Sequence, residues 1–192
     1  MIARFAVIGS NSFSGSHFVA RLLADGHTVL GLSRSPEVPA LYRAYQWHQP
    51  SERFTFKQAD LNEVESVASA LSNFNPEIVV NFAAQSMVAQ SWDYPEHWYR
   101  TNVLGIVELA KVLDQLPELH RYVHVTTPEV YGSTGGWISE SDNFRPSTPY
   151  AISRAAGDMH LAAMHEVSGL KVCFTRAANV YGPGQPLYRI IP

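Results

Sequence analysis

The residues with the clearest chemical potential are Tyr150 and Arg154, in the segment 149–154. Four positions apart on a helix, their side chains would lie on one face, about one turn from each other. A phenol, whose pKa is near 10 in water, exchanges a proton near neutral pH only where a fixed positive charge stabilises the phenolate. The hydroxyl of Thr127, upstream in the sequence, would complete a triad that moves a proton on or off a carbinol oxygen. The pattern therefore predicts acid–base chemistry coupled to hydride transfer.

Two kinds of element alternate along the chain and would position this triad. Apolar runs of strand length occur at residues 2–8, 28–33, 53–58, 77–83, 121–126 and 171–176, and helix-period segments at 14–25, 62–73, 95–115 and 148–168. Regular alternation of this kind indicates a parallel sheet with helices on both faces. The apolar runs lack a polar alternation, which is typical of strands buried on both sides. We therefore expect an α/β, doubly wound Rossmann fold, with residues 1–192 forming one NAD(P)-binding domain.

Composition and charge narrow the class of protein. The 192 residues are 46% hydrophobic and 16% charged, with a formal net charge of −3. This composition describes a globular domain and gives no electrostatic reason to expect nucleic acid or an anionic membrane as partner. No window approaches the roughly 18 apolar residues of a membrane span. The single cysteine fits a reducing compartment, so we expect a cytoplasmic protein. The histidines show no metal-ligand spacing, and we expect no metal site.

A glycine-bearing turn joins the first strand to the first helix. It runs from Gly9 to Gly15 and includes Ser12, Phe13 and Ser14. A dinucleotide pyrophosphate needs a tight turn, close backbone approach and exposed N–H groups at a helix N-terminus. The usual fingerprint has another glycine where Ser12 stands, so we expect Ser12 to adopt its backbone angles at some cost, or the pyrophosphate to be held differently. Alone, the turn fits an ordinary strand–helix junction equally well, but its place at the first such junction favours a cofactor.

The end of the second strand predicts which dinucleotide is bound. Ser33 and Arg34 stand where an acidic residue would bind the ribose 2′-hydroxyl of NAD. A hydroxyl followed by a guanidinium suits a 2′-phosphate instead. We therefore expect NADP, with NAD as the other possibility. The alternative interpretation of Arg34 is a solvated loop arginine.

Further candidates follow the third and fourth strands and interrupt one helix. Asp60, followed by Leu61, either caps a helix that starts near Asn62 or reaches the adenine amino group. Small residues after the fourth strand would let a cofactor lie against the backbone. This stretch comprises Phe82, Ala83, Ala84, Gln85 and Ser86. Asn102 is polar within an apolar helix and would hold a backbone segment or a water near the site.

Taken in order, these motifs resemble the extended short-chain dehydrogenase/reductase superfamily. The nearest members are the nucleotide-sugar 4,6-dehydratases, of the dTDP-glucose and GDP-mannose types, and the related nucleotide-sugar epimerases. The resemblance covers essentially the whole chain and rests on the glycine turn, Asp60-Leu61 and residues 81–86, 127–132, 150–154 and 176–185. It implies a nucleotide-sugar substrate and a homodimer formed through the helices near 95–115 and 148–168. It also implies a C-terminal substrate-binding lobe, most of which would lie outside these 192 residues.

The resemblance also implies roles for individual residues. Tyr150 would take the proton of the sugar 4-hydroxyl, Arg154 would stabilise the phenolate and hold the ribose, and Thr127 would bond the same sugar oxygen. Glu129 would remove the proton at C5, which favours a dehydratase over an epimerase. Other implied cofactor contacts are Asn102, Thr126, Ala178 and Val180, and the implied substrate contacts are Gln85, Ser86, Thr127, Pro128, Glu129 and Asn179.

Two departures from the family pattern leave alternatives open. Arg154 stands in place of the family's lysine, and Pro128 in place of the acid that dTDP-glucose dehydratases carry. GDP-mannose-type dehydratases also lack that acid, so dehydration is still expected. The first alternative is an epimerase or 4-ketoreductase, which needs Tyr150 and Thr127 but not Glu129. The second is a catalytically inactive dinucleotide-binding remnant.

Overall fold

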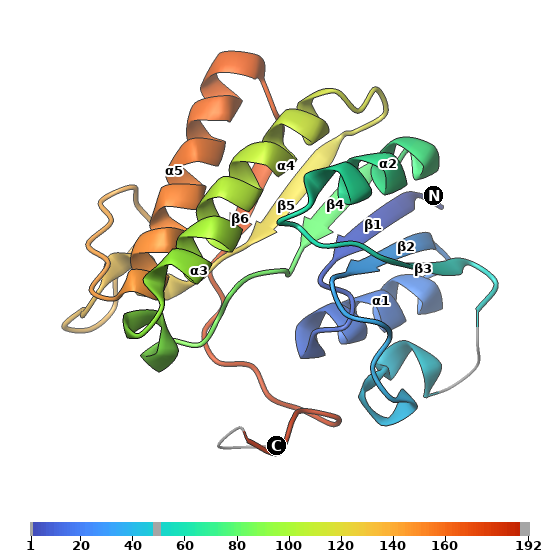
Figure 1. Ribbon diagram of the computed structural model, residues 1–192, viewed down its shortest axis with the longest axis horizontal. Coiled ribbons are helices and arrows are strands. Elements are labelled where there is room, and N and C mark those ends of the chain that lie inside the picture. The colour runs from blue at the N-terminus through green and yellow to red at the C-terminus, as the bar shows by residue number, and fades with distance from the viewer. Residues whose placement is uncertain (1, 48–50, 189–192) are drawn as a thin grey trace.

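The fold is built on one parallel sheet of six strands (Figure 1). The computed structural model describes residues 2–47 and 51–188. The strands are β1 (Arg4–Ile8), β2 (Thr28–Ser33), β3 (Phe54–Gln58), β4 (Ile78–Asn81), β5 (Arg121–Val125) and β6 (Val172–Thr175). Their order in the sheet is β3-β2-β1-β4-β5-β6, and every neighbouring pair is parallel. The expected doubly wound Rossmann sheet is confirmed.

Helices cover both faces of the sheet (Figure 1). One face carries α1 (Phe13–Ala24), and the other carries α2 (Val64–Phe74), α4 (Gly105–Asp114) and α5 (Pro149–Ser168). Between 95 and 114, α3 (Pro95–Tyr99) leads through the π-helical segment η4 (Arg100–Leu104) into α4, so the helix expected at 95–115 is one run with a wider turn inside it. The short 3₁₀ turns are η1 (Ala40–Tyr42), η2 (Ala44–Gln46), η3 (Ala89–Trp92) and η5 (Pro128–Tyr131). No helix in the described ranges is long and apolar enough to cross a membrane.

The core consists of two apolar layers, one on each face of the sheet. Along β1, Phe5 and Val7 pack into the layer under α1, whereas Ala6 and Ile8 pack into the layer under α2, α4 and α5. Both sides of the strand are buried, which explains why its sequence shows no polar alternation.

The apolar stripe of α4 faces this core and not solvent. Ile106, Ala110 and Leu113 are each at most 1% exposed, and Val103 and Val107 are half-buried. A homodimer formed through the helices near 95–115 and 148–168 therefore cannot use these three side chains, because they are already buried against the sheet.

The parallel register brings the loops of interest to one edge of the sheet. Ile8, at the end of β1, pairs with Leu32 of β2 and with Asn81 of β4. From β1 the chain builds outward to β2 and β3, and then crosses back to place β4 on the other side of β1, so the direction of strand addition reverses at β1. Ligands of open α/β sheets bind outside the carboxyl ends of the strands at such a switch point.

Candidate active site

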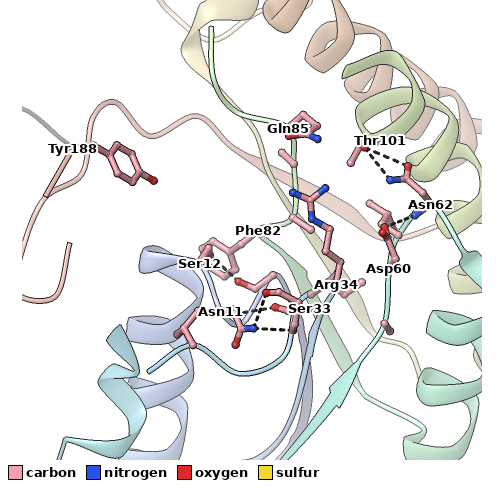
Figure 2. Close-up of a pocket in the computed structure, with 18 residues that line it drawn as sticks. Asn11, Ser12, Ser33, Arg34, Asp60, Asn62, Phe82, Gln85, Thr101 and Tyr188 are labelled. Carbon is pink, nitrogen blue, oxygen red and sulfur yellow. Dashed lines mark hydrogen bonds between the residues drawn. The ribbon is translucent and has the colours of Figure 1, made fainter. Parts of the chain in front are cut away.

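A cavity of about 470 Å³ opens at this carboxyl edge (Figure 2). Loops that follow β1, β2, β3 and β4 supply its walls. The expected cofactor-binding residues that line it are Gly9, Ser12, Ser33, Arg34, Asp60, Leu61, Phe82, Ala83, Ala84 and Gln85. Residues separated by up to 76 positions in the sequence thus meet around one space.

Sequence reasoning missed several residues that line the cavity. These are Ile8, Asn11, Ser35, Val38, Ala59, Asn62, Thr101 and Tyr188. Most of them are adjacent in sequence to residues that were expected to bind the cofactor, and this adjacency is the signal by which the sequence could have predicted them. Thr101 reaches the cavity from η4, where its hydroxyl lies 3.2 Å from the Asn62 amide nitrogen, and only tertiary packing brings it there.

Other expected residues lie outside this cavity. The loop after β6 leaves Ala178, Asn179 and Val180 exposed, and none of the three lines the cavity. Phe13, Ser14 and Gly15 form the first turn of α1 behind the glycine turn. Thr126 is buried, and its hydroxyl donates to the Asp158 carboxylate at 3.1 Å, so its polar group is used inside the protein.

The glycine turn needs glycine at its two ends but not in its middle. Gly9 has φ of +83°, and a Cβ there would lie 2.7 Å from the backbone nitrogen of Ala83. A Cβ on Gly15 would lie 2.2 Å from the Gly9 carbonyl oxygen. Ser12 has φ of −71° and ψ of 158°, which is ordinary extended backbone.

Ser12 is the N-cap of α1. Its hydroxyl accepts from the Gly15 N–H at 3.0 Å and donates to the Gly9 carbonyl at 2.7 Å. The expected conformational cost of serine at this position is therefore wrong, because a capping serine belongs in extended backbone and satisfies an otherwise free helix N–H.

Asn102 holds the loop that carries Phe82 to Gln85. Its Oδ1 accepts from the Gln85 N–H and its Nδ2 donates to the Gln85 carbonyl, both at 2.9 Å. The same Nδ2 lies 2.9 Å from the Ser153 hydroxyl on α5. The side chain is 2% exposed, within the π-helical η4. The expectation that Asn102 fixes a backbone segment is confirmed.

The end of β2 presents one anchored and one exposed side chain. The buried Ser33 hydroxyl accepts from the Asn11 N–H at 3.0 Å, so the protein itself uses this group. Arg34 is exposed, and Figure 2 shows its side chain extending into the cavity. The guanidinium is therefore the group at this strand end that is placed to meet a ligand.

Asp60 lines the cavity and does not cap a helix. Its Oδ1 accepts from the Asn62 N–H at 2.9 Å, which closes a local turn. Helix α2 begins at Val64, with Glu63 at the N-cap position and no side-chain cap. The helix-cap interpretation of Asp60 is therefore wrong.

The cavity fits a dinucleotide. Gly9 keeps a side chain out of the space between the first turn and the β4 loop, and Gly15 lets the first helix begin close against the turn. The N-terminus of α1 opens beside this space and supplies positive dipole character for a pyrophosphate. Arg34 brings a guanidinium to the cavity wall, and the small side chains of Ala83 and Ala84 leave room for a ligand beside the backbone.

The expected catalytic residues come from η5 and α5, which pack against each other. Thr148 caps α5 by accepting from the Ala151 N–H at 3.1 Å. In the first turn, Tyr150 is 8% exposed, and its N–H donates to the Ser91 hydroxyl at 3.1 Å. These contacts fix the backbone of Tyr150 at the helix start, at the same edge of the sheet as the cavity.

Thr127 and Glu129 lie on the other side of this contact. The buried Thr127 is the N-cap of η5, and its Oγ1 accepts from the Glu129 N–H at 3.3 Å. Because that bond uses the hydroxyl as an acceptor, its O–H hydrogen is free to donate. Pro128 occupies the first position of the turn, where a missing N–H costs nothing. Glu129 is exposed, yet partial desolvation raises the pKa of its carboxyl.

Arg154 points into the layer between β5 and α5. It is 3% exposed, its Nη2 donates to the Val125 carbonyl, and the same nitrogen lies 3.3 Å from His124 Nε2. A guanidinium only donates, so Nε2 accepts and the imidazole proton sits on Nδ1, which faces the Tyr122 hydroxyl at 2.9 Å. Burial, together with the charges of Arg154 and Arg176, holds the pKa of His124 well below its ordinary value. His124 is therefore a neutral acceptor for Arg154.

Asp158 is the carboxylate of this buried cluster. It is 1% exposed, and its Oδ2 accepts from Arg176 Nη2 at 3.0 Å and from Thr126 at 3.1 Å. Desolvation raises the pKa of Asp158, against the opposing effect of Arg154 and Arg176. One carboxyl beside two guanidiniums leaves the cluster with an excess of positive charge in the layer between β5 and α5.

Comparisons with known proteins agree with this architecture. The sequence matches the family described as GDP-mannose 4,6 dehydratase over residues 7–191. It is 30% identical to a dTDP-glucose 4,6-dehydratase of Xanthomonas campestris pv. campestris (strain B100), over 100% of this chain and 57% of that protein. It is 35% identical to a UDP-glucose 4-epimerase of Mycolicibacterium smegmatis, over 95% of this chain and 58% of that protein.

A solved structure extends the comparison to three dimensions. The dTDP-glucose 4,6-dehydratase DesIV from Streptomyces venezuelae, with NAD and TYD bound, has a TM-score of 0.87 at 34% identity. The match covers 98% of this chain and 60% of that one. The chain thus spans 57–60% of the length of these three proteins. It belongs to the nucleotide-sugar dehydratase and epimerase family of extended short-chain dehydrogenases/reductases.

Proposed function

We propose that this chain carries the dinucleotide site and the catalytic residues of a nucleotide-sugar 4,6-dehydratase. One observation carries the proposal: α5, whose first turn contains Tyr150, packs on η5, which contains Glu129 and is capped by Thr127. This contact stands at the same sheet edge as the dinucleotide-sized cavity. An acid–base tyrosine, a hydroxyl donor and a carboxylate beside such a cavity suit transient oxidation of a sugar followed by elimination.

Tyr150 is the proposed acid–base group for oxidation at the sugar C4. A bound nicotinamide would supply the hydride acceptor and donor. Tyr150 takes the proton of the 4-hydroxyl as C4 is oxidised, while Thr127 donates its free hydroxyl hydrogen to the same oxygen. Arg154, four residues further along α5, is the proposed positive charge that supports this proton transfer.

Glu129 is the proposed base for elimination. A 4-keto group acidifies the C5 hydrogen, so a carboxylate placed near C5 removes that proton and the C6 hydroxyl leaves as water. Desolvation raises the pKa of Glu129, and a carboxylate with a raised pKa is a stronger base. Pro128 has no proton to give, so Glu129 passes the proton taken from C5 to the leaving C6 hydroxyl, and the hydride removed from C4 would return to C6 from the bound nicotinamide.

NADP is the proposed cofactor, with NAD as the alternative. Arg34 is exposed, lines the cavity and follows the buried Ser33 at the end of β2, where no carboxylate stands to repel a 2′-phosphate. One or two charge-assisted bonds to that phosphate would be worth ~1.5–3 kcal/mol each. We expect calorimetry to show tighter binding of NADP(H) than of NAD(H), and Arg34→Ala to remove most of the difference. Equal dissociation constants in the unmodified protein would sink this assignment.

A cytoplasmic homodimer is the proposed assembly. Leu104, Ile152 and Met159, on η4 and α5, are 61%, 43% and 62% exposed, so the outward face of these helices keeps apolar side chains in water. Light scattering at tens of micromolar tests this, and we expect twice the chain mass. Met159→Glu should shift the protein to monomer, because a charge buried without a partner is costly at an interface.

The activity test compares nucleotide sugars directly. The protein is incubated with NADP or NAD and with dTDP-glucose, GDP-mannose or UDP-glucose, and 4-keto product is detected by its absorbance in alkali. Tyr150→Phe should abolish product and leave cofactor affinity nearly unchanged. Glu129→Gln should stop elimination but still allow oxidation at C4, visible as reduced cofactor in the near ultraviolet. Wild-type turnover by Tyr150→Phe would overturn the mechanism.

A 4-epimerase is the second candidate, because a UDP-glucose 4-epimerase is 35% identical to this sequence over 95% of the chain. Epimerisation also uses Tyr150 and Thr127 but has no step that requires Glu129. The same incubations separate the two activities: an epimerase returns sugar with inverted configuration at C4, leaves no 4-keto product and tolerates Glu129→Gln.

A further inference from the structure

The loop after β2 is tied to the glycine turn by one side chain, Asn11. Its Nδ2 lies 2.8 Å from the Pro36 carbonyl, 3.1 Å from the Ser35 carbonyl and 3.3 Å from the Ser35 hydroxyl. Its backbone N–H donates to the Ser33 hydroxyl at 3.0 Å. Asn11 therefore fixes residues on both sides of Arg34, and Figure 2 shows Asn11 and Ser33 joined in this way beneath the cavity.

This position requires a hydrogen-bond donor. The two carbonyl partners accept hydrogen bonds, so the group that faces them must be the amino end of Asn11. An aspartate of the same size would set a carboxylate against both carbonyls, and an alanine would leave the loop without a donor. The side-chain chemistry of Asn11 thus matches the backbone of the loop and does not merely fill space.

A second contact holds Arg34 from the opposite side. Gln58, at the end of β3, donates from Nε2 to the Arg34 carbonyl at 2.8 Å. The backbone of Arg34 is therefore fixed by its neighbours on one side and by Gln58 on the other, whereas its side chain is exposed in the cavity. Because its backbone is fixed, the guanidinium of Arg34 samples fewer positions, which lowers the entropic cost of ordering it on a ligand phosphate.

We infer that Asn11 is a specificity-determining positioning residue. It couples the glycine turn to the loop of Arg34, and so sets how strongly the site prefers a ligand with an adenosine 2′-phosphate over one without it. The inference rests on the proposed dinucleotide function. Asn11 acts through Arg34, because the amino group of its amide is committed to Ser35 and Pro36, the residues that follow Arg34.

The test measures discrimination and not affinity alone. Dissociation constants of adenosine 2′,5′-bisphosphate and of 5′-AMP are determined by calorimetry for the unmodified protein and for Asn11→Ala. Both probes carry the 5′-phosphate, so their ratio isolates the 2′-phosphate. We expect the ratio to fall by about tenfold in Asn11→Ala, the equivalent of one weakened charge-assisted hydrogen bond. In an Arg34→Ala background, Asn11→Ala should leave the ratio unchanged.

Each outcome decides the inference. A ratio that Asn11→Ala leaves intact, with both affinities lowered together, would mean that Asn11 is only structural and would overturn it. If Asn11→Ala does not fold, Asn11→Asp, which keeps the volume, is measured in its place and should lose discrimination as well. An unmodified protein that binds neither probe overturns the dinucleotide proposal itself. One that binds both equally leaves that proposal standing and overturns the role of Asn11.

Discussion

Replacing Asn102 by alanine tests how η4 supports the cavity at the carboxyl edge of the sheet. Asn102→Ala removes two hydrogen bonds to the Gln85 backbone and one to the Ser153 hydroxyl. Ser153 keeps its bond to the Tyr150 carbonyl at 2.7 Å, so only the two Gln85 groups lose the partner they depend on. We therefore expect the variant to unfold more readily and to hold a dinucleotide less tightly.

The magnitude follows from the burial of these groups. A buried polar group left without a partner costs ~1–3 kcal/mol. Gln85 is half-buried, so water satisfies its freed N–H and carbonyl in part. Alanine also gains ~0.5 kcal/mol of helix propensity over asparagine. The expected net loss in the free energy of unfolding is about 2–3 kcal/mol, which a domain with ~5–15 kcal/mol of stability survives.

Urea unfolding followed by circular dichroism measures this loss, and calorimetry measures the dinucleotide affinity. The matched control is Asn73→Ala in α2, where an exposed asparagine makes one weak contact of 3.5 Å to Ser69. The control should change stability by less than ~0.5 kcal/mol. If Asn102→Ala proves as stable as Asn73→Ala and binds dinucleotide equally well, Asn102 does not support the loop as argued.

Three further outcomes follow from the structure. Gly157→Ala places a Cβ 2.7 Å from the Asn102 carbonyl oxygen and should lower the free energy of unfolding in urea by ~1–3 kcal/mol. A Cβ at Gly135 has no atom within 4 Å, so Gly135→Ala should change that free energy by less than ~1 kcal/mol. The pKa of the Glu129 carboxyl is raised in the folded protein, so the folded protein binds the carboxyl proton more tightly than the unfolded chain does. The free energy of unfolding should therefore fall as pH rises through the window above 4.5. Glu129→Gln should flatten that slope in thermal unfolding between pH 4 and 7. Arg154→Lys keeps the charge and should retain product formation in the alkaline absorbance assay; abolished turnover would show that the guanidinium itself is required.

Much of the fold was predictable because its signals are local. Strands buried on both faces have apolar sequences of strand length, and short connections between alternating elements allow few topologies. The same logic placed the candidate loops, since the carboxyl ends of parallel strands share one edge. Ser12 was misjudged because glycine is usual at its position, although the preference of serine for helix N-caps was a readable signal.

The remaining features depend on tertiary contacts that no local pattern encodes. The wider turn of η4 brings Asn102 to the Gln85 backbone, a partner 17 positions away. The sequence allowed Asp60 to cap a helix, but α2 begins only at Val64, and Asp60 lines the cavity instead. Likewise, an apolar stripe on a helix shows which face is buried but not whether a sheet or another chain buries it.

The buried cluster fixes the guanidinium of Arg154, at the position where the resemblance to the family implied a lysine. Asn81 accepts from the Ala83 N–H at 2.9 Å and donates to the Tyr122 hydroxyl at 3.2 Å, and the chain of contacts continues through His124 to Arg154. It thus runs from the cofactor cavity to the helix of Tyr150. Because burial and the nearby guanidiniums keep His124 neutral, its acceptor nitrogen faces Arg154 throughout the physiological pH range. A planar guanidinium reaches this acceptor and the Val125 carbonyl together, so Arg154 supplies a positive charge whose place is set by the core of the fold.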